Sequence, residues 1–306
     1  MKGIYPAAVI TTVIALSLYG AIIWKMKSPV DKRWLWLAFL LVLPLQPLAF
    51  YLVRVPLNSL LMAKLGASSR LYEWITLFYA PLTEEPAKLV PLLVPFIFRD
   101  IRKENFVRYA LAIGLGFGLG EIWFIAGRIA GIPQFASTPF WQFTGFMNER
   151  LMVCLLHGAF VSVALWRLRN KFLLGVLGAM ALHFFANFPI YLMQKNLFGL
   201  GKTIWSVIVG NWVGLYTLGG IALLTYFVYG KVGLGRIIFG RTKCPECGNI
   251  YDSSFFALNL GTKRYERCPA CRKWHVVGVE DKLTKEEIAA GEEVSEPRAV
   301  ATGSRR

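Results

Sequence analysis

Residues 106–127 read FVRYALAIGLGFGLGEIWFIAG, a stretch in which Arg108 and Glu121 are the two charged positions. An α-helix needs about 20 consecutive apolar residues to cross the roughly 30 Å hydrocarbon core of a bilayer. Runs of comparable length and composition lie at 4–24, 34–53, 72–98, 106–127, 147–167, 172–193 and 203–229. The sequence therefore predicts about seven membrane-crossing segments between residues 4 and 229.

The overall composition also indicates a membrane-embedded chain. Of its 306 residues, 56% are hydrophobic and 17% are charged, whereas about 25% of the residues in a typical soluble domain are charged. The apolar runs lack the alternation of polar and apolar residues found in barrel strands, so helices must satisfy the backbone groups inside the hydrocarbon. The predicted fold class is an all-α multi-pass membrane protein over residues 1–230, and this composition excludes a water-soluble fold.

The basic residues are distributed in a pattern that orients the chain. The formal net charge is +16, and 14 of the 34 lysines and arginines follow residue 230. Of the others, Lys88 alone lies well inside a predicted span, and many crowd into three short loops at 25–33, 99–108 and 167–171. The positive-inside rule places such loops in the cytoplasm. We therefore expect a cell-membrane protein with its N-terminus outside and its C-terminal part in the cytoplasm, where the charge attracts anionic lipid rather than nucleic acid.

A second domain is predicted beyond residue 230, where the apolar runs end. Cys244-Pro-Glu-Cys247 and Cys268-Pro-Ala-Cys271 form two CxxC motifs separated by 20 residues. This spacing is typical of a zinc ribbon, in which four thiolates close the coordination sphere of a structural zinc ion. Two disulfides are the alternative, but they would require the opposite topology because cytoplasmic thiols remain reduced.

The ribbon is expected at residues 238–280. Gly248 suits the tight turn of the first CxxC motif, and the alternation in 272–279 predicts a strand behind the second. His275 is not expected to be a ligand, since four cysteines already complete the site. A ribbon of this kind can recruit a protein partner, while its basic residues also suit a lipid surface. Residues 281–306 are polar and are predicted to form a flexible tail.

Ionisable residues inside the predicted spans are the most informative for function. Glu84, Glu85 and Lys88 lie in TEEPAK, Glu121 lies in GFGLGEIWF, His157 lies in CLLHGAF, and His183 and Asn187 lie in LHFFANF. Such groups are costly in hydrocarbon and usually face the interior of a helix bundle with a partner. Glu84, His157 and His183 each fall near the middle of a predicted span, so we expect them to meet at one depth.

This set of side chains is suited to activating a water molecule. A carboxylate and an imidazole can deprotonate water directly, or two imidazoles and a carboxylate can hold a catalytic zinc ion with one open position. Asn187 can donate its amide to a developing oxyanion. The alternative is purely structural, because buried ion pairs and histidines also hold helices together. Cys154 shares a helical face with His157, but a thiol in hydrocarbon is a poor nucleophile.

The same residues resemble the motifs of a known enzyme family. TEEPAK looks like the EExxK motif of PrsW-type proteases, GFGLGE resembles their run of glycine and phenylalanine ending in glutamate, and His157 and the His183–Asn187 pair match their two remaining motifs. The wider superfamily includes membrane proteases that process CAAX proteins and bacteriocins. The resemblance covers residues 84–187 and implies catalytic roles for Glu84, Glu85, His157 and His183, supported by Glu121 and Asn187.

The function that this resemblance implies is hydrolysis of peptide bonds in membrane-tethered or membrane-proximal protein substrates. Two other classes remain open from the residues alone. An ion-coupled transporter could use the same carboxylates and histidines, although no internal repeat supports it. A non-catalytic scaffold or sensor could use the zinc ribbon to recruit its partner.

Overall fold

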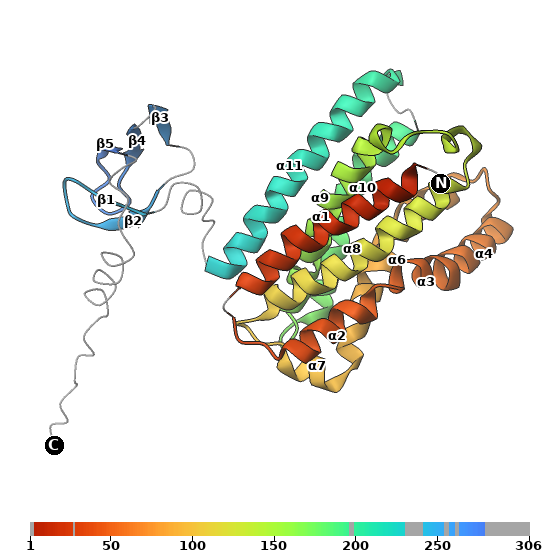
Figure 1. The fold of residues 1–306 in the computed structure, drawn as a ribbon, viewed down its shortest axis with the longest axis horizontal. Helices are drawn as coiled ribbons and strands as arrows, with labels where there is room; N and C mark the ends of the chain where they lie inside the picture. The colour runs from red at the N-terminus through yellow and green to blue at the C-terminus, as the bar shows by residue number, and fades with distance from the viewer. Residues whose placement is uncertain are drawn as a thin grey trace. The chain divides into compact units, whose positions relative to one another are not determined.

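The computed structural model describes residues 3–26, 28–195, 199–229, 241–253, 257–260 and 263–278. The chain divides into two compact units, Met1–Leu224 and Thr225–Arg306. The predicted tail at 281–306 lies outside the described residues. We call the first the helical unit and the second the β unit (Figure 1).

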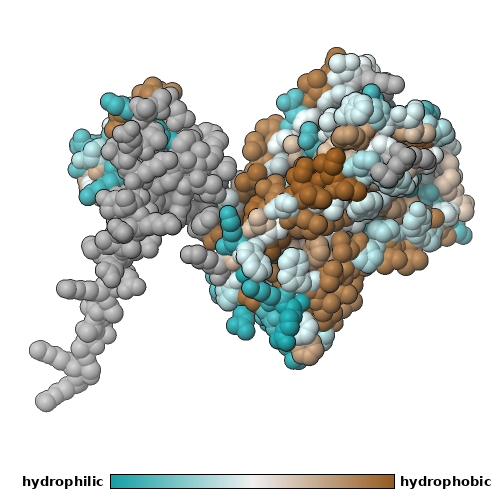
Figure 2. All heavy atoms as spheres, in the orientation of Figure 1, coloured by the Kyte–Doolittle hydropathy of each residue, from teal (hydrophilic) through white to brown (hydrophobic). Residues whose placement is uncertain are grey.

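Six helical segments among the described residues are long and apolar enough to cross a membrane. They are Ile4–Lys25, Leu45–Leu65, Phe106–Ala130, Phe140–Trp166, Phe172–Gln194 and Thr203–Val228. Many of their apolar side chains are exposed on the unit's surface, such as Leu52 at 68% and Leu173 at 69%, and Figure 2 shows apolar residues over much of the visible helical unit. The length and composition of these helices are those of a multi-pass helical membrane protein, in agreement with the predicted fold class.

The helices are arranged around one central helix. In chain order they are α1 (Ile4–Lys25), α2 (Lys32–Val42), α3 (Leu45–Ala49), α4 (Val55–Leu65), α5 (Arg70–Leu77), α6 (Tyr79–Lys88), α7 (Pro95–Asp100), α8 (Phe106–Ala130), α9 (Thr144–Trp166), α10 (Phe172–Gln194) and α11 (Lys202–Tyr229). Helix α8 packs against α1, α2 and α9 and is the most buried of the six candidate spans (Figure 1). The stretch at 106–127 is thus the core of the helical unit.

Glycines allow α8 to approach its neighbours closely. A Cβ atom added at Gly114 would lie 2.1 Å from the backbone nitrogen of Gly158 on α9. No side chain fits at that distance, so the two backbones are in direct contact, as small residues permit between membrane helices. Gly127 lies on the same helix, but a Cβ atom there would meet nothing within 4 Å.

We expect Gly114→Ala to destabilise the helical unit by roughly 1–3 kcal/mol, because the added methyl group must push α8 and α9 apart. The measurement is the free energy of unfolding in detergent. Gly127→Ala is the matched control and should be neutral or slightly stabilising, since alanine has the higher helix propensity. Equal destabilisation by both substitutions would contradict the close approach.

The second membrane segment lies further along the chain than predicted. Helix α2 ends at Val42, and a new run begins at Leu45 after Pro44, which has no N–H to donate to the preceding turn. A π-helical turn at Phe50–Arg54 joins α3 to α4, so that Leu45–Leu65 is the candidate span. The predicted span 34–53 is therefore wrong in its boundaries, because the candidate span continues through α4 to Leu65.

The predicted span 72–98 is not one helix. It is divided into α5, α6, a 3-10 turn at Val90–Leu93 and α7. Val94 has extended backbone angles, φ −80° and ψ 111°, immediately before Pro95. A proline disfavours the helical conformation of the residue before it, which explains the break. This segment is consequently absent from the six long helices, whereas seven spans were predicted.

The three basic loops lie together at one end of the helical unit. The Asn105 side chain donates to the Pro29 carbonyl at 2.9 Å, and the Arg108 guanidinium donates to the Ser28 carbonyl at 2.8 Å. The Arg169 guanidinium donates to the Phe98 carbonyl at 2.8 Å, which brings the third loop to the same end. The three loops are therefore neighbours in the fold, and the side of the membrane on which they lie stays a prediction.

We expect single cysteines at Asn170 and Ser137 to react with membrane-impermeant reagents from opposite sides. Both side chains belong to exposed residues, Asn170 in the third basic loop and Ser137 in the connection before α9. The assay uses a chain in which the five native cysteines are replaced by serine. Asn170→Cys should label from the cytoplasmic side because of the positive-inside rule. Labelling of both positions from the same side would refute the predicted orientation.

The β unit contains two small antiparallel sheets. Strands β1 (Arg241–Lys243) and β2 (Ile250–Asp252) form one, and β3 (Leu258–Leu260), β4 (Lys263–Arg267) and β5 (Trp274–Gly278) form the other in that order. Strand β5 confirms the strand predicted behind the second CxxC motif. Its burial alternates along the chain, as does that of β4, so one face of the three-stranded sheet is covered and the other is exposed.

Candidate functional site

A cavity of about 400 Å³ within the helical unit brings the predicted site residues together. Its lining includes Glu84 from α6, Glu121 from α8, His157 from α9, and His183 and Asn187 from α10. These are five of the six predicted residues, and they come from four helices that are distant in the sequence. Glu85, the sixth, does not line the cavity but touches one of the lining histidines.

Glu85 forms a buried cluster with Lys88 and His183. One oxygen of the Glu85 carboxylate accepts from the Lys88 ammonium group at 2.5 Å and contacts His183 Nδ1 at 2.5 Å. The exposed fractions of the three residues are 2%, 0% and 5%. Buried charges must be paired, and Lys88 and Glu85 neutralise each other. The contact of Glu85 with Nδ1 also fixes the orientation of the His183 ring. Lys88 therefore pairs with Glu85 and not with Glu84.

Glu84 faces His183 from the other side of the imidazole ring. One Glu84 oxygen accepts a hydrogen bond from the Arg54 guanidinium at 2.7 Å, and the other lies 3.8 Å from His183 Nε2. A separation of 3.8 Å is too long for a direct hydrogen bond, but one water molecule can contact both atoms. Glu84 is 4% exposed and lines the cavity. A carboxylate and an imidazole placed in this way can contact one water molecule and act on it together.

A second carboxylate–imidazole pair lies on α8 and α9. His157 Nε2 is 2.9 Å from a Glu121 oxygen, and Arg150 Nη1 is 2.9 Å from the other Glu121 oxygen. Arg150 also donates to Glu149 at 2.8 Å. The His157 Nδ1 atom is buried without a hydrogen-bond partner among the described residues. The contact with Glu121 thus fixes the orientation of the His157 ring.

The two carboxylate–imidazole pairs adjoin across the cavity. The ring centroids of His157 and His183 are 6.0 Å apart, and Phe160 stacks on His183 at 5.6 Å. The prediction that Glu84, His157 and His183 meet at one depth agrees with this placement. Cys154 is buried but is not among the residues that line the cavity.

Sequence reasoning missed two arginines that contact the predicted carboxylates. Arg54 and Arg150 both lie within candidate membrane spans, so the prediction that Lys88 alone lies well inside a span is wrong. Arg150 precedes His157 by two helical turns and therefore shares its face, which is a signal the sequence contains. Arg54 carries no such signal, because the predicted second span, 34–53, ended just before it.

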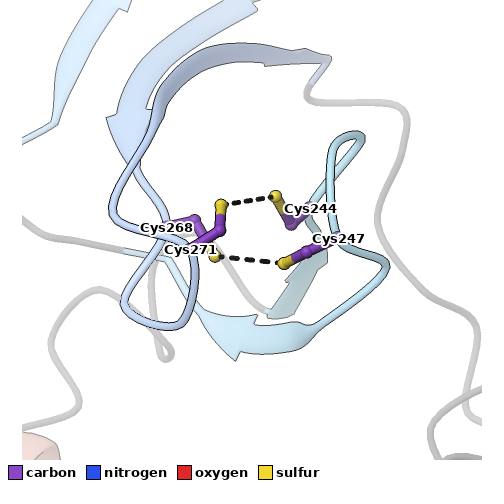
Figure 3. Close-up of side chains that lie close together, drawn as sticks. All are labelled: Cys244, Cys247, Cys268 and Cys271. Atoms are coloured by element: carbon purple, nitrogen blue, oxygen red, sulfur yellow. Dashed lines mark hydrogen bonds between the residues drawn. The ribbon is translucent and has the colours of Figure 1, made fainter.

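Four cysteines form a compact cluster in the β unit. Cys244 Sγ lies 3.7 Å from Cys271 Sγ, and Cys247 Sγ lies 3.7 Å from Cys268 Sγ (Figure 3). All four sulfurs lie within 4.8 Å of one another. A tetrahedral zinc site with Zn–S bonds of about 2.3 Å separates its sulfurs by about 3.8 Å, so the cluster fits a metal ion of this kind. The glutamates and histidines of the cavity form no such group in the part of the chain that the structure describes.

The backbone around each CxxC motif supports the cluster. Cys244 N–H donates to the Asn249 carbonyl at 2.9 Å, and Cys268 N–H donates to the Lys273 carbonyl at 3.0 Å. Gly248 has φ +72°, which confirms the predicted tight turn, and Arg272 takes φ +60° at the equivalent place in the second motif. Burial acts to raise the pKa of the Cys268 thiol, but hydrogen bonds with the backbone N–H groups of Cys271 and Ala270 and with the Cys244 and Cys271 side chains lower it to about 7.

His275 is not among the residues that form the cysteine cluster and has a different partner. Its Nε2 atom lies 2.7 Å from the Tyr251 hydroxyl, and the residue is 8% exposed. Burial raises the pKa of the Tyr251 hydroxyl, and the nearby Glu266 carboxylate raises it further. The tyrosine therefore stays protonated and serves as a buried hydrogen-bonding partner of His275.

No protein-family model matches this chain, and comparisons with curated proteins and with solved structures give no match either.

Proposed function

We propose that the protein is an intramembrane peptidase that hydrolyses peptide bonds of membrane-tethered or membrane-proximal proteins. The observation that carries this proposal is the cavity of about 400 Å³ in which Glu84 and His183 face a common point beside Glu121, His157 and Asn187. The order of these residues in the chain also resembles the motifs of PrsW-type proteases.

The proposed mechanism uses a water molecule between Glu84 and His183. Glu84 takes a proton from this water while the water oxygen attacks the peptide carbonyl carbon. Glu84 then delivers the same proton to the leaving amine when the C–N bond breaks. Asn187 lines the cavity and donates its amide to the oxyanion of the tetrahedral intermediate. Glu85 and Lys88 act as positioning residues, since Glu85 contacts the His183 ring without lining the cavity.

The arrangement supports a direct role for the carboxylate and imidazole over a metal-bound water. Each cavity carboxylate already contacts a cation, Arg54 for Glu84 and Arg150 for Glu121. A catalytic zinc ion would have to displace these arginines in order to bring two imidazoles and a carboxylate onto one centre. We therefore assign the four cysteines, and not the cavity, as the metal-binding site.

We further propose that the metal is zinc and that the β unit is a zinc ribbon. Four thiolates with sulfur separations near 3.7 Å favour zinc, and a complete shell of four cysteines leaves no open position for catalysis. The ion then has a structural role in the folding of the small β unit.

The test of the peptidase proposal is a comparison of membrane proteins from cells that produce the wild-type chain, Glu84→Gln or Glu73→Gln. Glu73 is an exposed carboxylate paired with Lys195 outside the cavity, so its substitution is the matched control. We expect new protein fragments with the wild type and Glu73→Gln but not with Glu84→Gln. Identical fragment patterns in all three would leave transport or scaffolding as the better explanation.

A further inference from the structure

The three-stranded sheet of the β unit carries an apolar face that no described residue covers. On this face the exposed fractions are 61% for Leu258, 53% for Leu260, 38% for Tyr265, 57% for Trp274 and 49% for Val276. The alternating residues of the opposite face, such as Glu266 and Val277, are buried. We call the exposed side of β3, β4 and β5 the aromatic face.

The strand register makes the aromatic face continuous. Leu258 is paired with Tyr265, which is in turn paired with Val276 on the next strand. The rings of Tyr265 and Trp274 stack with their centroids 5.1 Å apart and their planes 20° apart. Residues directly opposite or diagonal on a sheet are in contact, so these side chains form one patch instead of scattered exposed residues.

Basic residues flank this patch on the same side of the sheet. Lys263 and Arg267 are exposed at the two ends of β4, in the same alternation as Tyr265. The acidic residue of that strand, Glu266, is 0% exposed and points to the buried side. The described residues of the aromatic face therefore combine apolar and aromatic groups with positive charge and include no carboxylate.

A short stretch of chain connects the β unit to the end of α11. Helix α11 ends at Tyr229 and β1 begins at Arg241, so the intervening residues 230–240 span at most about 40 Å. Helix α11 contains a candidate membrane span, Thr203–Val228, which ends at this connection. With α11 across a bilayer, this tether would limit the distance between the β unit and the bilayer surface, which raises the effective concentration of the surface.

We propose that the aromatic face docks on the surface of an anionic bilayer. Tryptophan and tyrosine favour the headgroup region, leucine and valine enter the acyl boundary, and lysine and arginine attract anionic phosphates. All three kinds of residue occur together on this face, and the tether supplies proximity. The docking is independent of the peptidase activity, since no residue of the cavity takes part in it.

The test uses the full chain, loaded with zinc, in lipid nanodiscs of phosphatidylcholine with or without phosphatidylglycerol. A photo-crosslinking residue, p-benzoylphenylalanine, replaces Trp274 or Val276 on the aromatic face, and replaces the exposed Ala270 in the second CxxC motif as a control. Zinc content is measured for each variant to confirm that the β unit is folded. We expect lipid adducts from positions 274 and 276 in anionic nanodiscs, several times more abundant than from position 270.

Charge reversal separates lipid docking from other contacts. Lys263→Glu combined with Arg267→Glu should lower the yield of lipid adducts by at least about fivefold, since each basic residue contributes about that factor at an anionic surface. Equal lipid adducts from positions 270 and 274 would overturn the proposal. Adducts with protein, or with added RNA, in place of lipid would overturn it as well and would identify the aromatic face as a macromolecular binding site.

Discussion

Glu84→Gln is expected to lower the rate of peptide-bond cleavage by roughly 10²–10⁴-fold, the usual effect of removing a general base. Glutamine retains the shape of the side chain but cannot accept the proton of the attacking water. The rate is measured with purified protein in detergent and a membrane-anchored protein substrate. Because Glu84 already lies against Arg54 and near His183 in the cavity, the substitution changes the chemistry without enlarging the site.

The matched control for this prediction is Glu73→Gln, which makes the same change of carboxylate to amide outside the cavity. It should cleave at the wild-type rate. Cys154→Ser should also remain active, since the thiol does not line the cavity. If Glu84→Gln and His183→Ala both cleave as fast as the wild type, the peptidase proposal fails and the ion pairs have only a structural role.

The other cavity residues are expected to differ in the size of their effects. His183→Ala and His157→Ala should lose nearly all activity, because each removes an imidazole from a carboxylate–imidazole pair. Asn187→Ala should lower the rate by roughly 10²–10³-fold, the typical cost of one oxyanion donor. A rate for Asn187→Ala equal to the wild type would exclude its proposed role while leaving the water-activating pair intact.

Removal of zinc is expected to unfold the β unit completely while leaving the helical unit folded. The buried apolar cluster of the described β unit consists of Cys244, Tyr251 and Cys268, with Cys271 packed against it. Three of these four residues are predicted ligands, so little core remains once the metal is gone. Structural zinc typically contributes about 10–16 kcal/mol of apparent binding free energy in small domains, which exceeds the stability of such a domain.

Hydrogen exchange of the full chain measures this effect. Amides in β4 and β5 should lose their protection after chelation, whereas those in α8 should keep it. Cys268→Ser should abolish binding of the one zinc ion per chain, and Cys154→Ser, the matched control, should leave the zinc content unchanged. Protection of the strands after complete zinc removal would show that the metal is not required for folding.

Local features of the fold were predictable because they depend on residues close together in the chain. Hydropathy identified the membrane helices at 4–24, 106–127 and 172–193 to within a few residues, since desolvation of a helix depends on its own composition. The spacing of the four cysteines likewise identified the metal cluster, because each CxxC turn orients two sulfurs by itself. The breaks in the predicted span 72–98 were harder to predict from the sequence, although Pro95 indicated one of them.

The amino-acid sequence by itself determined that this chain is a multi-pass helical protein with a cysteine cluster, and which polar residues must be shielded from lipid. Only the tertiary structure decided how those residues pair. Glu84 and Glu85 are adjacent, yet Glu85 contacts Lys88 and His183 whereas Glu84 contacts Arg54 and opens into the cavity. The reason is geometric: neighbouring side chains on a helix point about 100° apart, and their partners depend on how other helices pack against each side.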